Sequence, residues 1–181
     1  MYGNLSQEQV DLFHACTKRV MPVELIPGCA LSKAEIKRLI PHRPPMLLVD
    51  RLAAIDRKKG NALAYFDLKH GKKAMSGHFP SGPIWPGVLQ IESIGQVGAL
   101  IFALLNDQKV SNVSVTHVCG ARFMHAIAPD NLVSEGGTIE FRVQIFMEEP
   151  FAIFIGQTIY HQKICSVAAV KEYYHGSQSG I

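Results

Sequence analysis

Residues 77–93, GHFPSGPIWPGVLQIES, place one histidine and one carboxylate in a segment that is otherwise apolar and rich in proline. His78 can accept a proton when its imidazole is neutral. Glu92 falls about one turn into an expected helix, where a carboxyl on an apolar surface is costly to ionise and can donate a proton. A base and an acid of this kind are what the elimination of water from a β-hydroxyacyl compound requires.

The backbone between the two residues is suited to hold a substrate carbonyl. Pro80, Pro83 and Pro86 stiffen the chain ahead of the helix, because each ring fixes its φ angle. The N–H groups near Gly87 and Val88 have no partner within the helix and lie at the positive end of its dipole. They could polarise a carbonyl, as an oxyanion hole does. A structural role for the histidine and an ion pair for the glutamate remain open alternatives.

Helical and strand patterns predict how this segment is positioned. Residues 88–105 are apolar almost all round, which indicates a helix buried on most sides. Gly95 and Gly98 within it suggest close packing against a sheet. Six runs favour strands: 46–56, 62–68, 113–124, 132–146, 151–160 and 163–173. We therefore predict an α+β fold in which a curved antiparallel sheet wraps a long central helix, and its edge strands favour a dimer.

The first 31 residues are predicted to form a helical arm and a linker. Ser6 and Gln9 are spaced as a capping box before a helix at residues 6–19, and Pro22, Pro27 and Gly28 then break the pattern. A second capping box, Ser32 with Glu35, opens a short helix at 33–39. The expected organisation is an arm at 1–31, one domain at 32–175 and a loose tail at 176–181.

Composition excludes several other classes of protein. With 181 residues, 48% hydrophobic and 18% charged, the chain can form a globular core. The net charge of +3 comes without a basic stripe, which argues against nucleic-acid binding. No apolar run spans a membrane, no secretory signal is evident, and the four cysteines form no CxxC pair, so a reduced cytoplasmic protein is expected. No histidine spacing indicates a metal site.

Three motifs resemble one known family. The first is Gly77-His78-Phe79-Pro80, then Pro83, Pro86-Gly87-Val88-Leu89 and Glu92; the second is IKRLIPHRPPMLLVDRL at 36–52; the third and weaker is ARFMHAIAPDNLV at 121–133. Together they are similar to the β-hydroxyacyl-acyl carrier protein dehydratases of fatty acid synthesis, which have the hot-dog fold. The resemblance spans about residues 32–174.

The resemblance implies roles for individual residues. His78 matches the catalytic histidine, and Glu92 matches the catalytic acid, which in this family comes from the other subunit of a dimer. Gly87 matches the residue whose backbone N–H polarises the thioester carbonyl. Ile84 matches the position whose backbone carbonyl orients the histidine ring. A glutamate at 92 resembles the general dehydratase branch rather than the branch that also isomerises the double bond.

Four further residues are candidates for lining the acyl tunnel or positioning the pair: Phe79, Trp85, Val88 and Gln96. Gln96 follows Glu92 at i+4, so a hydrogen bond between them is expected. Trp85 replaces a smaller residue of the family pattern, and it either reshapes the tunnel or fills core volume. His42 and Arg43, ahead of Pro44-Pro45, are expected to fix a turn.

The expected enzyme is a dehydratase that converts 3-hydroxyacyl thioesters into trans-2-enoyl thioesters. The substrate would travel on the phosphopantetheine of an acyl carrier protein, without any other cofactor. A homodimer is expected, with a trimer of dimers or a heterodimer with a related subunit left open. The departures at Ser81, Gly82 and Trp85, together with the arm, suggest a specialised polyketide or unsaturated lipid pathway beside fatty acid synthesis. The alternatives are a hot-dog thioesterase and a non-catalytic acyl-binding partner subunit.

Overall fold

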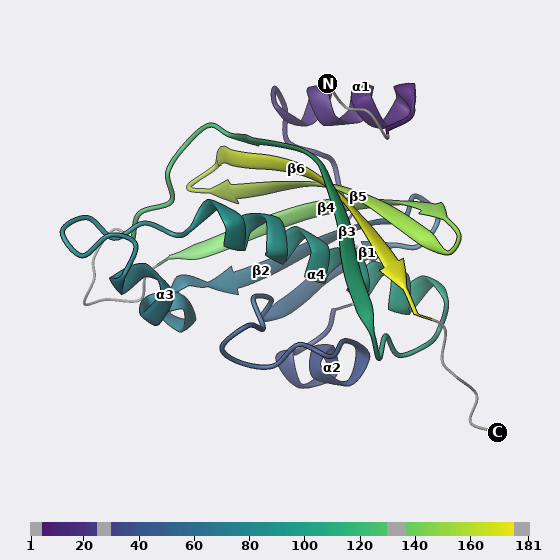
Figure 1. Ribbon diagram of the computed structural model, residues 1–181, viewed down its shortest axis with the longest axis horizontal. Coiled ribbons are helices and arrows are strands. Elements are labelled where there is room, and N and C mark those ends of the chain that lie inside the picture. Colours follow the sequence, from purple (N-terminus) through teal and green to yellow (C-terminus); the bar gives the residue numbers. More distant parts are fainter. Residues whose placement is uncertain (1–4, 25–29, 130–136, 176–181) are drawn as a thin grey trace.

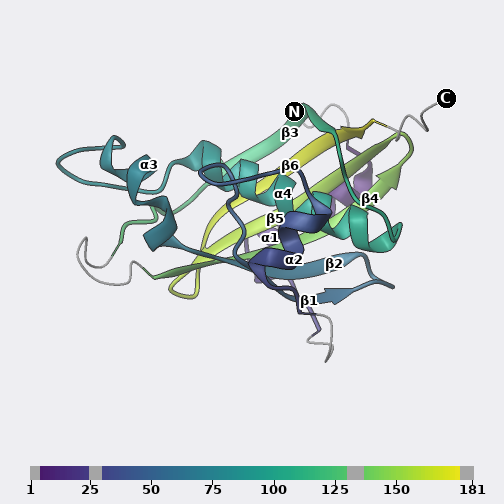
Figure 2. The same cartoon turned by 90° about the horizontal axis from the view of Figure 1, so that it is seen from below.

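One antiparallel sheet and one long helix dominate the computed structural model, which describes residues 5–24, 30–129 and 137–175. The sheet has the strand order β1-β2-β4-β5-β6-β3 and curves around α4 (Gly87–Leu105). Figures 1 and 2 show α4 lying along the sheet. The strands are β1 (Arg51–Asp56), β2 (Asn61–Asp67), β3 (Val113–Phe123), β4 (Thr138–Glu148), β5 (Phe151–Tyr160) and β6 (Lys163–Tyr174). The predicted α+β hot-dog architecture is confirmed.

Two glycines let α4 approach the sheet closely. A Cβ added at Gly98 would stand 2.4 Å from the ring of Phe154 on β5, and one at Gly95 would stand 2.6 Å from Glu172 on β6. The close packing predicted for these glycines is therefore confirmed. By length and mean hydropathy of 1.7, α4 could cross a membrane, but 61% of it is buried inside the protein. Its apolar surface forms the core.

The N-terminal arm packs on the face of the sheet opposite to α4 (Figure 1). Helix α1 (Gln7–Cys16) starts at the predicted capping box of Ser6 and Gln9, and buries Phe13 against outward-facing side chains of β5 and β6. Gln157 on β5 anchors the chain that follows. Its Nε2 donates to the carbonyl oxygens of Cys16 and Arg19 at 2.6 and 2.7 Å, and its Oε1 accepts from the Met21 N–H at 2.7 Å.

Several predicted boundaries differ from the structure. β1 begins at Arg51 rather than at residue 46, because Gln96 of α4 holds residues 46–48 along the helix instead of in the sheet. A 3-10 turn η1 (Leu68–Gly71) and a short helix α3 (Lys72–Ser76) precede the His78 loop and were not predicted. Helix α2 (Lys33–Leu39) has its predicted capping box. The predicted loose tail and the start of the fourth strand lie outside the described residues.

Candidate active site

The His78 loop is held by backbone hydrogen bonds at both of its ends. The His78 N–H donates to the Met75 carbonyl oxygen at 2.8 Å, which ties the loop to α3. Phe79 and Gly82 exchange two backbone hydrogen bonds, of 3.4 and 3.1 Å, and close a tight turn. The Phe79 ring stacks on the His78 imidazole, with centroids 4.4 Å apart. The histidine thus lies on a fixed loop, as the prolines predicted.

Ile84 contacts His78 through a different atom from the one expected. The Ile84 N–H donates to the His78 carbonyl oxygen at 2.8 Å. His78 Nδ1 is buried and makes no hydrogen bond within the described part of the chain, so the expected bond to the Ile84 carbonyl is not formed. Ile84 therefore fixes the backbone of His78 here, and its role in orienting the ring stays a prediction.

Glu92 lies on the second turn of α4 and is held by a neighbour on the same helix. Gln96 Nε2 donates to Glu92 Oε1 at 2.8 Å, as the i+4 spacing predicted. Gln96 is itself fixed, because its Oε1 accepts from the Leu48 N–H and its Nε2 also donates to the Met46 carbonyl oxygen. His42 Nε2 lies 3.4 Å from the same oxygen of Glu92. This last contact could not be predicted from the spacing of the two residues.

The start of α4 presents unpaired donors. Pro86 is the N-cap residue and its side chain cannot cap, and neither Gly87 nor Val88 donates its N–H to any acceptor among the described residues. The ring of Phe123 packs on Gly87, where an added Cβ would stand 2.8 Å from the ring. These N–H groups, at the positive end of a 19-residue helix, can polarise a carbonyl.

The remaining candidates divide between the surface and the core. Phe79 and Val88 are exposed beside the His78 loop and the helix start, as residues at the mouth of a site would be. Trp85 is 1% exposed and packs against Phe66, with ring centroids 5.1 Å apart, and over Gly71. Of its two possible roles, this placement agrees with filling core volume.

A buried carboxyl beneath α4 was missed by the sequence reasoning. Glu172 on β6 is 3% exposed and accepts a hydrogen bond from the Tyr174 hydroxyl at 2.8 Å. Burial raises the pKa of Glu172 to about 8, with a further rise from the charge of Glu92 and an opposing effect of Tyr174. The period of two along β6 places Glu172 in phase with the inward-facing Ala168 and Val170, and this signal could have found it.

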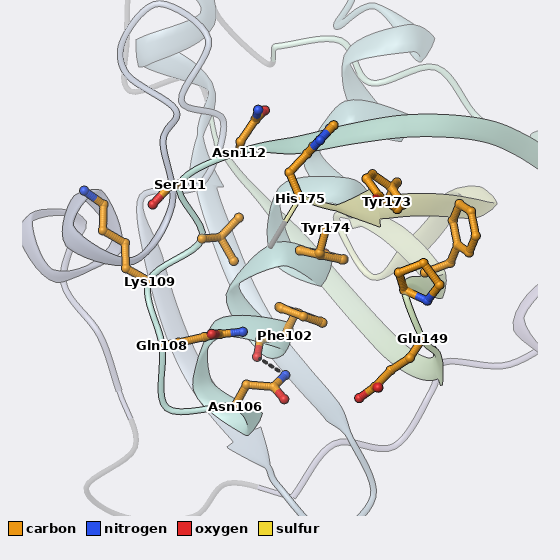
Figure 3. Close-up of a pocket in the computed structure, with 13 residues that line it drawn as sticks. Phe102, Asn106, Gln108, Lys109, Ser111, Asn112, Glu149, Tyr173, Tyr174 and His175 are labelled. Atoms are coloured by element: carbon orange, nitrogen blue, oxygen red, sulfur yellow. Dashed lines mark hydrogen bonds between the residues drawn. The ribbon is translucent and has the colours of Figure 1, made fainter. Parts of the chain in front are cut away.

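A pocket of about 1160 Å³ lies at the other end of α4 (Figure 3). It is lined by aromatic and polar side chains, among them Phe102, Asn106, Asn112, Tyr173, Tyr174 and His175. Tyr174 stacks on Phe102 with centroids 3.6 Å apart. Neither His78 nor Glu92 lines this pocket, and no hydrogen bond or ion pair joins those two residues among the described residues. Within one chain, the predicted pair is therefore not joined by a direct polar contact.

Known proteins resemble this chain in sequence and in fold. A family model described as a FabA-like domain matches residues 40–162. The 3-hydroxyacyl-[acyl-carrier-protein] dehydratase FabZ of Campylobacter concisus is 29% identical over 78% of this chain and 95% of its own length, and that of Bacillus licheniformis is 34% identical over 64% and 80%. The dehydratase heterocomplex ApeI:P from Xenorhabdus doucetiae has a similar fold, with a TM-score of 0.60 at 14% identity over 78% of this chain and 91% of that one.

Proposed function

The chain belongs to the FabA-like family, and we propose on this basis that it is a 3-hydroxyacyl-[acyl-carrier-protein] dehydratase of fatty acid biosynthesis. One observation carries the assignment of the site. The fixed His78 loop leads directly into the unpaired N–H groups at the start of α4, and Glu92 follows within two turns. This arrangement has a base, a carbonyl-polarising site and an acid in the order that the elimination needs.

The chemistry follows from these groups. His78 takes the proton from C2 of the substrate, while the Gly87 N–H stabilises the negative charge that develops on the thioester oxygen. Glu92 gives its proton to the hydroxyl that leaves from C3. The C2–H and C3–O bonds break, the C2=C3 double bond forms and water departs. These groups supply every proton transfer, so the reaction needs no cofactor beyond the phosphopantetheine that carries the acyl group.

A second copy of the chain would complete the site. β3 is an edge strand with β6 as its neighbour on one side, and an unpaired strand of this length invites pairing with another chain. Its side chains Val115, Val118 and Phe123 are each about half exposed, and Phe123 packs on Gly87 at the start of α4. These features support a homodimer that pairs its β3 strands. The heterocomplex described for the Xenorhabdus neighbour is a property of that protein.

Antiparallel β3 pairing about a two-fold axis would join His78 and Glu92 from different chains. The start of one β3 would then face the end of the other. Val115, near the start, pairs with Glu172, which lies beneath the helix turn that follows Glu92. Phe123, at the end, packs on Gly87 beside the His78 loop. The acid of one chain would thereby approach His78 of the partner subunit.

Exposed lysines beside the site suit an acidic carrier protein. Lys72 and Lys73 lie on α3, immediately before the His78 loop, and both side chains are exposed. A carrier protein bound there could direct its phosphopantetheine towards the start of α4. We propose this surface as the docking site, because opposite charges attract the acidic carrier protein to the lysines. Its phosphopantetheine could then reach the site from there.

Product analysis tests the proposed activity. The purified protein is incubated with 3-hydroxyacyl carrier proteins, and mass spectrometry follows the loss of water while a thiol reagent follows release of the carrier. We expect the trans-2-enoyl thioester to accumulate without free thiol, and we expect His78→Ala to reduce the rate about 10²- to 10⁴-fold. Free thiol without enoyl product would establish a thioesterase instead. An unchanged rate in His78→Ala would contradict the site.

A further inference from the structure

The contact between His42 and Glu92 joins two parts of the chain that lie 50 residues apart in sequence. His42 stands in the loop after α2, and its Nε2 is 3.4 Å from Glu92 Oε1. Gln96 donates to this same oxygen at 2.8 Å. Two nitrogen atoms from two elements therefore converge on Oε1, and neither of them contacts Glu92 Oε2 in the described hydrogen bonds and ion pairs.

The loop that carries His42 is tied to α4 independently of the imidazole. Gln96 bonds to the backbone of Met46 and Leu48, and these bonds fix residues 46–48 along the helix. The turn itself is held by Arg43, whose guanidinium donates to the carbonyl oxygens of Ile40 and His42 at 2.9 and 2.7 Å. His42 and Arg43 were both expected to fix this turn. Arg43 does so, whereas the His42 ring points to Glu92.

The imidazole itself has an unusual environment for a structural residue. Its Nδ1 is buried and has no hydrogen-bond partner within the described residues, which is costly for a polar atom and calls for a reason. Burial is the main cause of a lowered pKa for His42; Glu92 acts in the opposite direction and Arg43 in the same one. The ring is therefore neutral near pH 7, with Nε2 as the nitrogen that faces the carboxyl.

We propose that His42 is a positioning residue for Glu92, which it holds together with Gln96 so that Oε2 carries the proton to the departing hydroxyl. This inference rests on the proposed function. When Glu92 loses its proton, the carboxylate charge is shared with Oε1, which accepts a hydrogen bond from Gln96 and lies 3.4 Å from His42 Nε2, and both nitrogen atoms stabilise the anion as it forms. Among the described residues, the titratable groups that interact with Glu92 are His42 from the loop and Glu172 from β6, while Arg43 acts on His42.

Steady-state kinetics of single and double variants test the proposal. We expect His42→Ala to lower kcat about 10- to 100-fold with little change in KM, because a misplaced acid slows the chemical step more than binding. His42→Gln, which restores an N–H donor, should recover part of the loss. In a Glu92→Gln background, His42→Ala should have less than about a two-fold further effect, since both changes remove one function. His14→Ala, on α1 across the sheet, is the matched control.

Two outcomes would overturn the proposal. The first is an unchanged kcat in His42→Ala while the wild type forms enoyl product. The second is an equal fall in kcat in the wild-type and Glu92→Gln backgrounds, which would indicate a structural role. A readout that does not depend on activity is the pH titration of the ¹⁵N-labelled His42 imidazole, identified by its loss in His42→Ala. Glu92→Gln should lower the pKa of His42 further, because the Glu92 charge acts to raise it, and an unchanged pKa would count against the contact even if the proposed reaction failed.

Discussion

The carboxyl of Glu172 lies directly beneath Gly95, so that a Cβ added at position 95 would stand 2.6 Å from Glu172 Oε1. Gly95 follows Glu92 by three residues and therefore shares its side of α4. The helix thus carries the half-buried Glu92 carboxyl near its start, and the Glu172 carboxyl of β6 is buried against the same side. Because the buried group has a pKa raised to about 8, the folded protein keeps a proton there at neutral pH.

This proton makes stability depend on pH. The folded-state pKa of Glu172 is above the unfolded value, so its contribution is fully present below the unfolded pKa and is lost as pH rises towards about 8. Between pH 5 and pH 8.5 the loss amounts to roughly 4 kcal/mol. Glu172→Gln, which still accepts from Tyr174, should remove most of this dependence. Urea unfolding followed by the fluorescence of Trp85 at both pH values would measure it, and equal pH dependence in both proteins would contradict it.

Gly87 should be sensitive to any side chain. A methyl group there would meet the Phe123 ring at 2.8 Å and push the helix start away from the substrate carbonyl. We expect Gly87→Ala to lower kcat/KM by about 10-fold or more, because small displacements of an oxyanion donor are costly. Gly77→Ala is the control, since its Cβ would have nothing within 4 Å. Similar rates in the two variants would count against the role of Gly87.

Gln157 should decide whether the arm stays on the sheet. Gln157→Leu would leave the Met21 N–H and the carbonyl oxygens of Cys16 and Arg19 without their buried partner. We expect a loss of roughly 3 kcal/mol in unfolding free energy and faster proteolysis within the first 24 residues. Gln7→Leu, which removes an exposed hydrogen bond within α1, should change neither. An arm equally protected in both variants would disprove the anchoring.

The lysines of α3 should matter only for a substrate on its carrier protein. Reversing both charges, Lys72→Glu with Lys73→Glu, should lower kcat/KM for acyl carrier protein substrates about 10-fold or more at low salt. The same variant should process a free pantetheine thioester at the wild-type rate. Lys163→Glu, on the exposed end of β6, is a charge-reversal control away from α3. Equal losses with both substrates would show that α3 acts on the chemistry rather than on docking.

Local patterns in the sequence were enough to predict most of the fold. The apolar run before Leu105 became α4 within one residue, and the capping boxes at Ser6 and Ser32 both formed. The i+4 relation of Gln96 to Glu92 also held, because it depends on helix geometry alone. These features are local, so the residue types and their spacing suffice to define them.

Long-range packing limited what could be predicted of the site. Nothing in the spacing of His42 and Glu92 indicates that a loop before the sheet returns to the start of α4. Residues 46–50 read as a strand because they are apolar, but Gln96 holds part of this segment against the helix. His78 Nδ1 likewise has no hydrogen-bond partner among the residues that the structure describes. These three features depend on contacts between segments far apart in sequence. Sequence periodicity indicates local structure and does not predict such contacts.

The central claim is that each site takes His78 from one chain and Glu92 from the other, and mixed dimers test it most directly. His78→Ala and Glu92→Gln chains, each of strongly reduced activity alone, are co-expressed with different affinity tags, and the dimer that carries both tags is purified. In this dimer one of the two sites has both wild-type residues, so we predict about half of the wild-type activity. A mixed dimer as inactive as its two parents would contradict the shared site.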